Sequence, residues 1–177
     1  MADPKPPSSP RPIVNIHDVT ASTDDTRTKE HGDAFACSIT PVSAHNGAQK
    51  LAYNITTVPP GKRAFPFHNH HVAEEMFLVL SGTGTLRFGD AEHPLREGDC
   101  VACPPGGADV AHQIINTGDV ELRYFALATD EANDVFEYPD SHKFGVSVGR
   151  KPQSRFMESR LWGIWDQAAT KDYWDGE

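Results

Sequence analysis

The chain has 177 residues, a net charge of −9 and 38% hydrophobic residues. This length allows one domain with a sizeable core, and the acidic balance argues against a nucleic-acid partner, because phosphate backbones recruit basic surfaces. No apolar run approaches the ~20 residues that cross a bilayer, which argues against a membrane protein. The odd number of cysteines, three, and the absence of a leader-like start favour a cytoplasmic location.

The N-terminal part of the chain changes character twice. Residues 1–12 contain five prolines and almost no apolar side chain, so we expect a disordered, Pro-rich tail. Residues 13–50 are expected to form N-terminal strands that serve as an arm. From Leu51 to Val58 the residues alternate as in a strand, and Pro59-Pro60-Gly61 then ends it with a turn.

The same pattern of a short strand and a glycine-containing turn continues to residue 129. No long helix interrupts it, which predicts an antiparallel sandwich or barrel with its core in residues 51–130. The further strand segments are Met76 to Leu80, Thr83 to Phe88, His93 to Arg96, Cys100 to Cys103, Val110 to Asn116 and Val120 to Thr129.

Residues 131–177 are predicted to be a C-terminal extension. This segment holds all three tryptophans, and Met157, Leu161, Ile164 and Trp165 fall at helical spacing, although Gly163 lies among them. We therefore expect a short helix here that packs on the barrel or on a partner chain.

A candidate metal site stands out in the strand-rich region. His68 and His70 lie at positions i and i+2 of an extended segment, so their side chains point the same way and can bind one ion together. Glu75 begins an apolar strand, where a buried carboxylate is favourable only beside a cation. With His112 these residues make a mixed nitrogen and oxygen set, which suits one divalent ion of Fe, Mn, Zn, Ni, Co or Cu.

The spacing of these residues resembles the first cupin motif, G-x5-H-x-H-x3,4-E-x6-G. His68, His70, Glu75 and Gly82 all fall at permitted positions, whereas Gly61 precedes His68 by one residue more than the motif has. The match is specific because four chemically distinct positions agree.

The second cupin motif, G-x5-P-x-G-x2-H-x3-N, is matched less regularly. Gly98, Pro104 and Gly106 agree, but three extra residues precede His112, which then stands at the correct spacing from Asn116. Asp109 occupies the place that the unmodified motif gives to histidine. His112 is the favoured fourth ligand, with Asp109 as the alternative.

The resemblance to cupins implies an all-β fold, a double-stranded β-helix (jelly-roll) barrel with short N- and C-terminal extensions. It also implies a homodimer formed through N-terminal strands and outer sheet faces, for which Ile13 to Ser43 is the candidate segment. Small cupins that this chain resembles include proteins provisionally called sugar-phosphate isomerases.

Two reaction classes fit the expected ligand set, because three imidazoles and one carboxylate leave an octahedral ion with an open position. One is isomerase or epimerase chemistry on a sugar or sugar-phosphate, and the other is Fe(II)-dependent dioxygenase chemistry. A cupin that binds a small molecule or a metal without turnover is the third alternative. The expected partner is in each case a small molecule.

Overall fold

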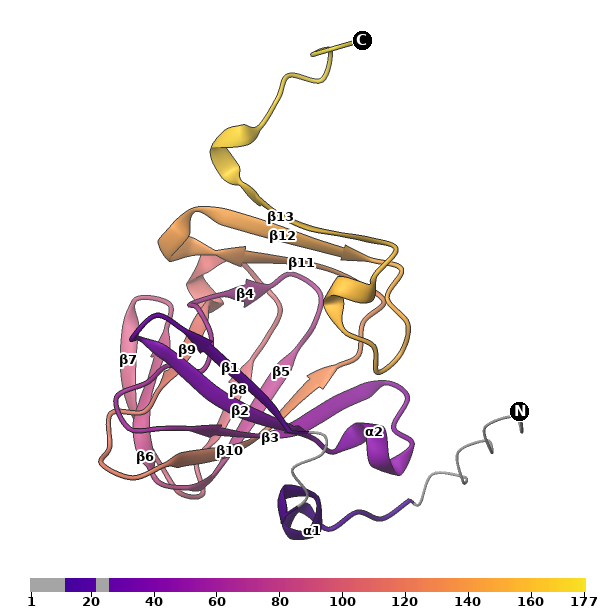
Figure 1. The fold of residues 1–177 in the computed structure, drawn as a ribbon. Helices are drawn as coiled ribbons and strands as arrows, with labels where there is room; N and C mark the ends of the chain where they lie inside the picture. Colours follow the sequence, from indigo (N-terminus) through magenta and orange to yellow (C-terminus); the bar gives the residue numbers. More distant parts are fainter. Residues whose placement is uncertain (1–11, 22–25) are drawn as a thin grey trace, which may run out of the picture.

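The computed structural model describes residues 12–21 and 26–177 of the chain (Figure 1). The tail predicted for residues 1–12 therefore lies, except for its last residue, outside the described residues. Close to half of the described residues lie in strands. The strands in chain order are β1 (Arg27–His31), β2 (Phe35–Pro41), β3 (Leu51–Val58), β4 (Asn69–His70), β5 (Glu75–Ser81), β6 (Thr83–Phe88), β7 (Ala91–Arg96), β8 (Cys100–Cys103), β9 (His112–Ile115), β10 (Leu122–Thr129), β11 (Asn133–Tyr138), β12 (Lys143–Val148) and β13 (Leu161–Asp166).

Helices in the described residues are short. Two are α-helical, α1 (Ile16–Ala21) and α2 (Ser43–Asn46), and both precede β3. The others are single 3-10 turns between or after strands, namely η1 (Ala108–Val110), η2 (Pro139–Ser141), η3 (Phe156–Glu158) and η4 (Gln167–Ala169). None of the helices in the described part of the chain is long and apolar enough to span a membrane.

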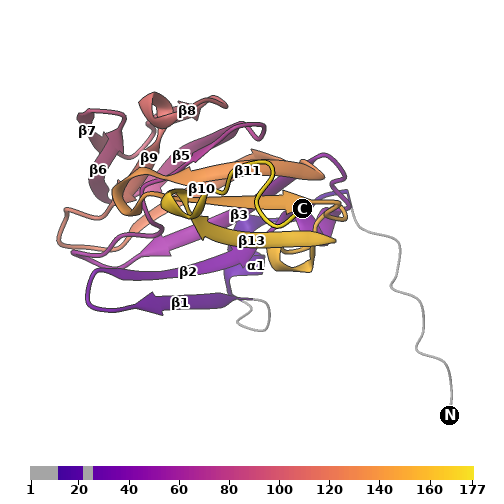
Figure 2. The same cartoon turned by 90° about the horizontal axis from the view of Figure 1, so that it is seen from above.

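The strands form two facing layers. In Figure 1, β2, β3 and β10 of one layer run along the bottom, β11, β12 and β13 of the other run along the top, and β6 and β7 lie at the left. One layer is a six-stranded antiparallel sheet in the order β1-β2-β3-β10-β5-β8, with β1 at its margin (Figure 2). The other layer consists of a three-stranded sheet, β7-β6-β9, and a four-stranded sheet, β13-β12-β11-β4. An isolated antiparallel bridge between His68 and His112 connects these two sheets. This arrangement is the predicted double-stranded β-helix.

The hydrophobic core lies between the layers and explains the strand pattern. On β5 the alternate residues Phe77 and Val79 are buried, and Tyr124 on β10 is 1% exposed. Leu86 and Ile114 meet them from the opposite layer, in the same cluster. Because successive side chains of a strand point to opposite faces, Glu75 shares the inward face with Phe77 and Val79.

The C-terminal extension differs from the sequence prediction. The prediction of a short helix between residues 157 and 165 is wrong. The structure instead forms the 3-10 turn η3 and then strand β13, whose residues Leu161 to Asp166 pair antiparallel with β12. Bulky aromatic and branched side chains favour a strand, and Gly163 disfavours a helix interior. The segment also extends the barrel, since β11 pairs with β4.

Candidate metal centre

Three histidines of the centre come from one layer, and their backbone positions are fixed by strand pairing. His68 and His112 lie directly opposite each other and exchange both backbone hydrogen bonds, at 2.8 and 3.2 Å between N and O. Such a pair brings the two Cβ atoms within ~5.5 Å of each other. His70 follows two residues after His68, so its side chain lies on the same face. The ring centroids of His68 are 4.7 Å from His112 and 5.2 Å from His70.

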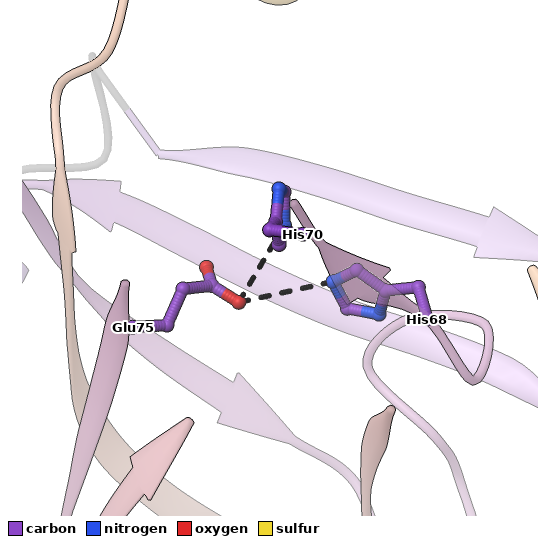
Figure 3. A group of neighbouring side chains, drawn as sticks. All are labelled: His68, His70 and Glu75. Atoms are coloured by element: carbon purple, nitrogen blue, oxygen red, sulfur yellow. Dashed lines mark ion pairs between the residues drawn. The ribbon is translucent and has the colours of Figure 1, made fainter. Parts of the chain in front are cut away.

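Glu75 reaches the histidines from the opposite layer (Figure 3). One of its carboxylate oxygens, Oε2, lies 2.9 Å from Nε2 of His112, 3.6 Å from Nε2 of His70 and 3.9 Å from Nε2 of His68. The four side chains are only 4–20% exposed. The ligand atoms of His68, His70 and Glu75 lie within 4.8 Å of one another, and His112 adjoins this group through its contact with Glu75, so the structure brings together all four residues that the sequence predicted as ligands.

The other nitrogen of each imidazole is engaged on the side away from Glu75. Nδ1 of His68 lies 2.8 Å from the Pro66 carbonyl oxygen, and Nδ1 of His70 lies 2.6 Å from Oδ2 of Asp134. Nδ1 of His112 is 3.4 Å from the Val110 carbonyl oxygen. A carbonyl and a carboxylate oxygen accept hydrogen bonds, so Nδ1 carries a proton in His68 and His70. Against the lowering effect of burial, Asp134 and Glu75 raise the pKa of His70.

The electrostatics of the centre favour a bound cation. Burial of the His68 ring, with the repulsion of His112, lowers its pKa to about 4, so His68 is neutral at pH 7. Burial opposes ionisation of Glu75, but the hydrogen bond with His112 and the nearby His70 outweigh it and lower the Glu75 pKa to about 2. Nε2 of His68 thus presents a lone pair beside an ionised carboxylate. Because that carboxylate only accepts hydrogen bonds, Nε2 of His112 donates to Glu75 and must lose this proton before it binds a metal ion.

Around the imidazoles lie aromatic rings from several elements. The Phe77 ring is 5.6 Å from His112, the Tyr138 ring stacks on His68 at 6.2 Å, and the Phe156 ring stacks on His70 at 6.4 Å. Phe136 lies 6.0 Å from His70. The Tyr138 phenol has a raised pKa because of burial. Phe156 is 40% exposed, so this ring lies at the solvent side of the centre.

Sequence reasoning missed the contribution of β11. His70 of β4 is directly opposite Phe136 of β11, and the residues two positions before and after Phe136 share its face. These are Asp134, which holds His70, and Tyr138, which stacks on His68. The available signal was a carboxylate that shares a strand face with two aromatic residues, much as Glu75 shares its face with the apolar residues Phe77 and Val79.

The alternative fourth ligand, Asp109, lies elsewhere. It is in the 3-10 turn η1, where its side chain is exposed, whereas His112 is 3% exposed and contacts Glu75. The three residues inserted into the second motif therefore lengthen the loop before β9. His71, which follows His70, points away from the centre and lies 3.3 Å from Glu137.

The fold and the cluster together define a class of protein, a double-stranded β-helix barrel with a candidate mononuclear metal centre between its layers. Residues 54–128 match the family model of the cupin domain. This confirms the resemblance found in the sequence. The matched segment contains all four residues of the candidate centre.

Two solved structures match most of the chain in fold. A protein from Acidithiobacillus ferrooxidans, provisionally described as a sugar phosphate isomerase, has a TM-score of 0.77 and 23% identity, over 92% of this chain and 96% of the other. A cupin from Silicibacter pomeroyi, described as a sugar phosphate isomerase, has a TM-score of 0.65 and 21% identity, over 78% and 82%. At these identities the likeness shows the fold alone.

The curated relatives are matched over shorter stretches. Protein SchB from Streptomyces halstedii is 35% identical over 95 residues, which are 54% of this chain and 64% of SchB. Auxin-binding protein 1 from Arabidopsis thaliana is 28% identical over 107 residues, 55% of this chain and 52% of that protein. The chain thus spans less than two thirds of the length of the curated relatives that it matches.

Proposed function

We propose that this chain is a metal-dependent enzyme acting on a small molecule, with one divalent transition metal held by His68, His70, Glu75 and His112. The observation that carries the proposal is the shared orientation of the three imidazoles. Each directs Nε2 at the same Glu75 oxygen, while Nδ1 faces an acceptor on the outer side. Histidines that bind metals commonly show this arrangement, because the outer hydrogen bond fixes the tautomer and the ring orientation.

A metal ion with four protein ligands and an open position would supply Lewis-acid chemistry to a bound substrate. The chain's own residues prepare the site for this. Asp134 and the Pro66 carbonyl hold the rings of His70 and His68, and the aromatic rings of Phe77 and Phe136 limit access of water. The Tyr138 hydroxyl stays protonated at neutral pH, because burial raises its pKa, and it is therefore available as a proton donor.

The first candidate reaction is isomerisation or epimerisation of a sugar or sugar-phosphate. It is supported by the descriptions of the two proteins whose folds match most of this chain. Isomerisation moves a proton between neighbouring carbon atoms, and epimerisation removes a proton from one carbon and returns one to its opposite face; neither reaction consumes an oxidant. Glu75 would remain ionised throughout, since its pKa of about 2 lies far below neutral pH.

A second candidate, Fe(II)-dependent dioxygenase chemistry, is favoured by the composition of the wall. The groups that hydrogen-bond, ion-pair or stack with the three imidazoles are aromatic rings, carboxylates and backbone carbonyls. A phosphorylated substrate would be recognised best by arginine, lysine or backbone amides. An apolar or aromatic substrate fits these direct contacts better, whereas the cationic groups of Arg150 and Lys143 lie over the Phe156 and Tyr138 rings.

Metal analysis of the purified protein, followed by parallel activity assays, tests the proposal. One equivalent of a transition metal is expected, and it should be lost in His70→Ala but retained in His71→Ala, whose ring points away from the centre. Deuterium exchange into a sugar without oxygen uptake supports the isomerase, and oxygen uptake with the Fe(II) protein supports the dioxygenase. Metal binding with neither activity would identify a binding protein, and absence of metal binding would refute the proposed centre.

A further inference from the structure

Strand β13 is an edge strand without the usual protection of edges. The outermost strands of the described sheets are β1, β4, β7, β8, β9 and β13, and of these β4 and β9 adjoin each other through the His68–His112 bridge. Natural edges are commonly short or carry charges or proline, because an open edge can pair with another chain. β1 is Arg-Thr-Lys-Glu-His, β7 contains Glu92 and Pro94, and β8 has only four residues. β13, in contrast, reads Leu-Trp-Gly-Ile-Trp-Asp.

Both faces of β13 expose large apolar side chains. Leu161 and Trp165 lie on one face and are 52% and 41% exposed. Trp162 and Ile164 lie on the other face and are 38% and 41% exposed. Such a concentration on one open edge is unusual for a surface that faces water only.

The residues of this strand are complementary to themselves in the antiparallel direction. A twofold axis at Gly163 would place Leu161 opposite Trp165 of a second copy, and Trp162 opposite Ile164 of that copy. One position further out, Arg160 would face Asp166, so the two ends of the pairing carry opposite charges. On each face of such a ribbon apolar residues meet apolar residues, and cross-strand pairs of this kind stabilise a sheet.

We propose that β13 is a dimer interface, in which β13 of one copy pairs antiparallel with β13 of a second copy about an axis at Gly163. The partner is this same chain because the register satisfies both the apolar pairs and the charged pair with one sequence. The pairing would join the two β4-to-β13 sheets into one continuous sheet across the twofold axis, as expected for an isologous contact. It involves the opposite end of the chain from the N-terminal contact that the sequence predicted, where three of the five residues of β1 are charged.

Light scattering after gel filtration measures the consequence directly. The unmodified chain should have twice the mass of one 19.4 kDa copy. Ile164→Lys places like charges near the axis and should halve the mass, whereas the matched edge variant Thr28→Lys on β1 should leave it unchanged. A mass of one copy for the unmodified chain, or halving by Thr28→Lys alone, would overturn the proposal.

The register has its own test. Arg160→Asp would set two carboxylates opposite each other and should weaken the dimer, and the double variant Arg160→Asp with Asp166→Arg should restore it. A double variant as weak as the single one would contradict the axis at Gly163.

Hydrogen exchange of the unmodified chain tests the β13 interface even if a variant fails to fold. The amides of residues 161–166 that face away from β12 should lose protection when the protein is diluted into its monomeric range, while the amides that face β12 and those of β1 should not. Protection in β13 that does not change with dilution, in a protein that does dissociate, would exclude this strand as the interface.

Discussion

The carboxylate of Asp134 offers a sharp test of how the candidate centre is held. Its side chain is 1% exposed, and its two oxygens accept different donors, Nδ1–H of His70 at 2.6 Å and the backbone N–H of Val72 at 3.0 Å. Asp134→Asn keeps the size but leaves only one acceptor oxygen for two donors. If the amide oxygen faces His70, then the Val72 N–H faces an NH2 group. If the amide nitrogen faces His70, then the imidazole proton must move to Nε2, where it blocks the metal.

The free-energy cost of Asp134→Asn follows from these two hydrogen bonds. An unsatisfied buried donor destabilises a protein by about 1–3 kcal/mol. Removing the outer partner of a metal-binding histidine commonly weakens metal affinity by about 10–100-fold, which corresponds to about 1.4–2.7 kcal/mol. We therefore expect Asp134→Asn to bind Zn²⁺ about 10–100-fold more weakly than the unmodified chain.

Competition with a chromophoric chelator at pH 7 measures this affinity, and chemical denaturation of the metal-free protein verifies that the variant is folded. Asp140→Asn is the matched control, because it also removes one carboxylate, but that carboxylate pairs with Arg87 and is 51% exposed. Unchanged affinity in a folded Asp134→Asn variant would refute the argument that this carboxylate orients His70.

Three further predictions concern the candidate metal centre and the turn between β5 and β6. His70→Ala should abolish metal uptake yet keep a cooperative unfolding transition, as judged by metal content and circular dichroism, because apolar strands supply the core; loss of the fold would instead indicate a structural ion. The metal-free protein should lose about 3 kcal/mol of stability as the pH falls from 6.5 to 4. His68 has a pKa of about 4 in the folded protein and 6.5 as its ordinary value, so in this pH range the unfolded chain binds a proton that the folded protein does not. Denaturation at several pH values measures this loss, and His68→Asn should reduce it. Gly82→Ala should cost about 1–3 kcal/mol in the same assay, because Gly82 has φ +85° and an added Cβ would lie 2.5 Å from the Glu121 carbonyl oxygen; an unchanged midpoint would contradict the strain.

The barrel and the four candidate ligands were predictable because their signals are local. Alternation along a strand places His68 and His70 on one face, and it places Glu75 on the inward face of β5 with Phe77. These rules need no knowledge of which strands pair. The structure adds that His112 lies opposite His68, which explains why a residue more than forty positions away belongs to the same cluster. Metal binding by the four residues stays a prediction.

The surroundings of the centre could not be predicted in the same way, because they depend on the pairing of β11 with β4. Asp134 and Tyr138 lie outside the two motifs, and nothing in their sequence neighbourhood says which strand they will face. The helix prediction for the following segment failed for a related reason. Helical spacing and strand pairing were both compatible with Leu161 to Trp165, and the open edge of β12 decided in favour of a strand.

The candidate ligands and their surroundings come from different parts of the chain, and this limits what the relatives show about this protein. The segment that matches the cupin family ends at residue 128, so it includes the four candidate ligands but not β11. The carboxylate that holds His70 and the two rings beside His68 and His70, Tyr138 and Phe156, all come after it. A relative that shares only the matched segment can therefore share the metal ligands while presenting a different wall to its substrate. For this reason the substrate of this chain is better sought through residues 133–158 than through the motifs that define the family.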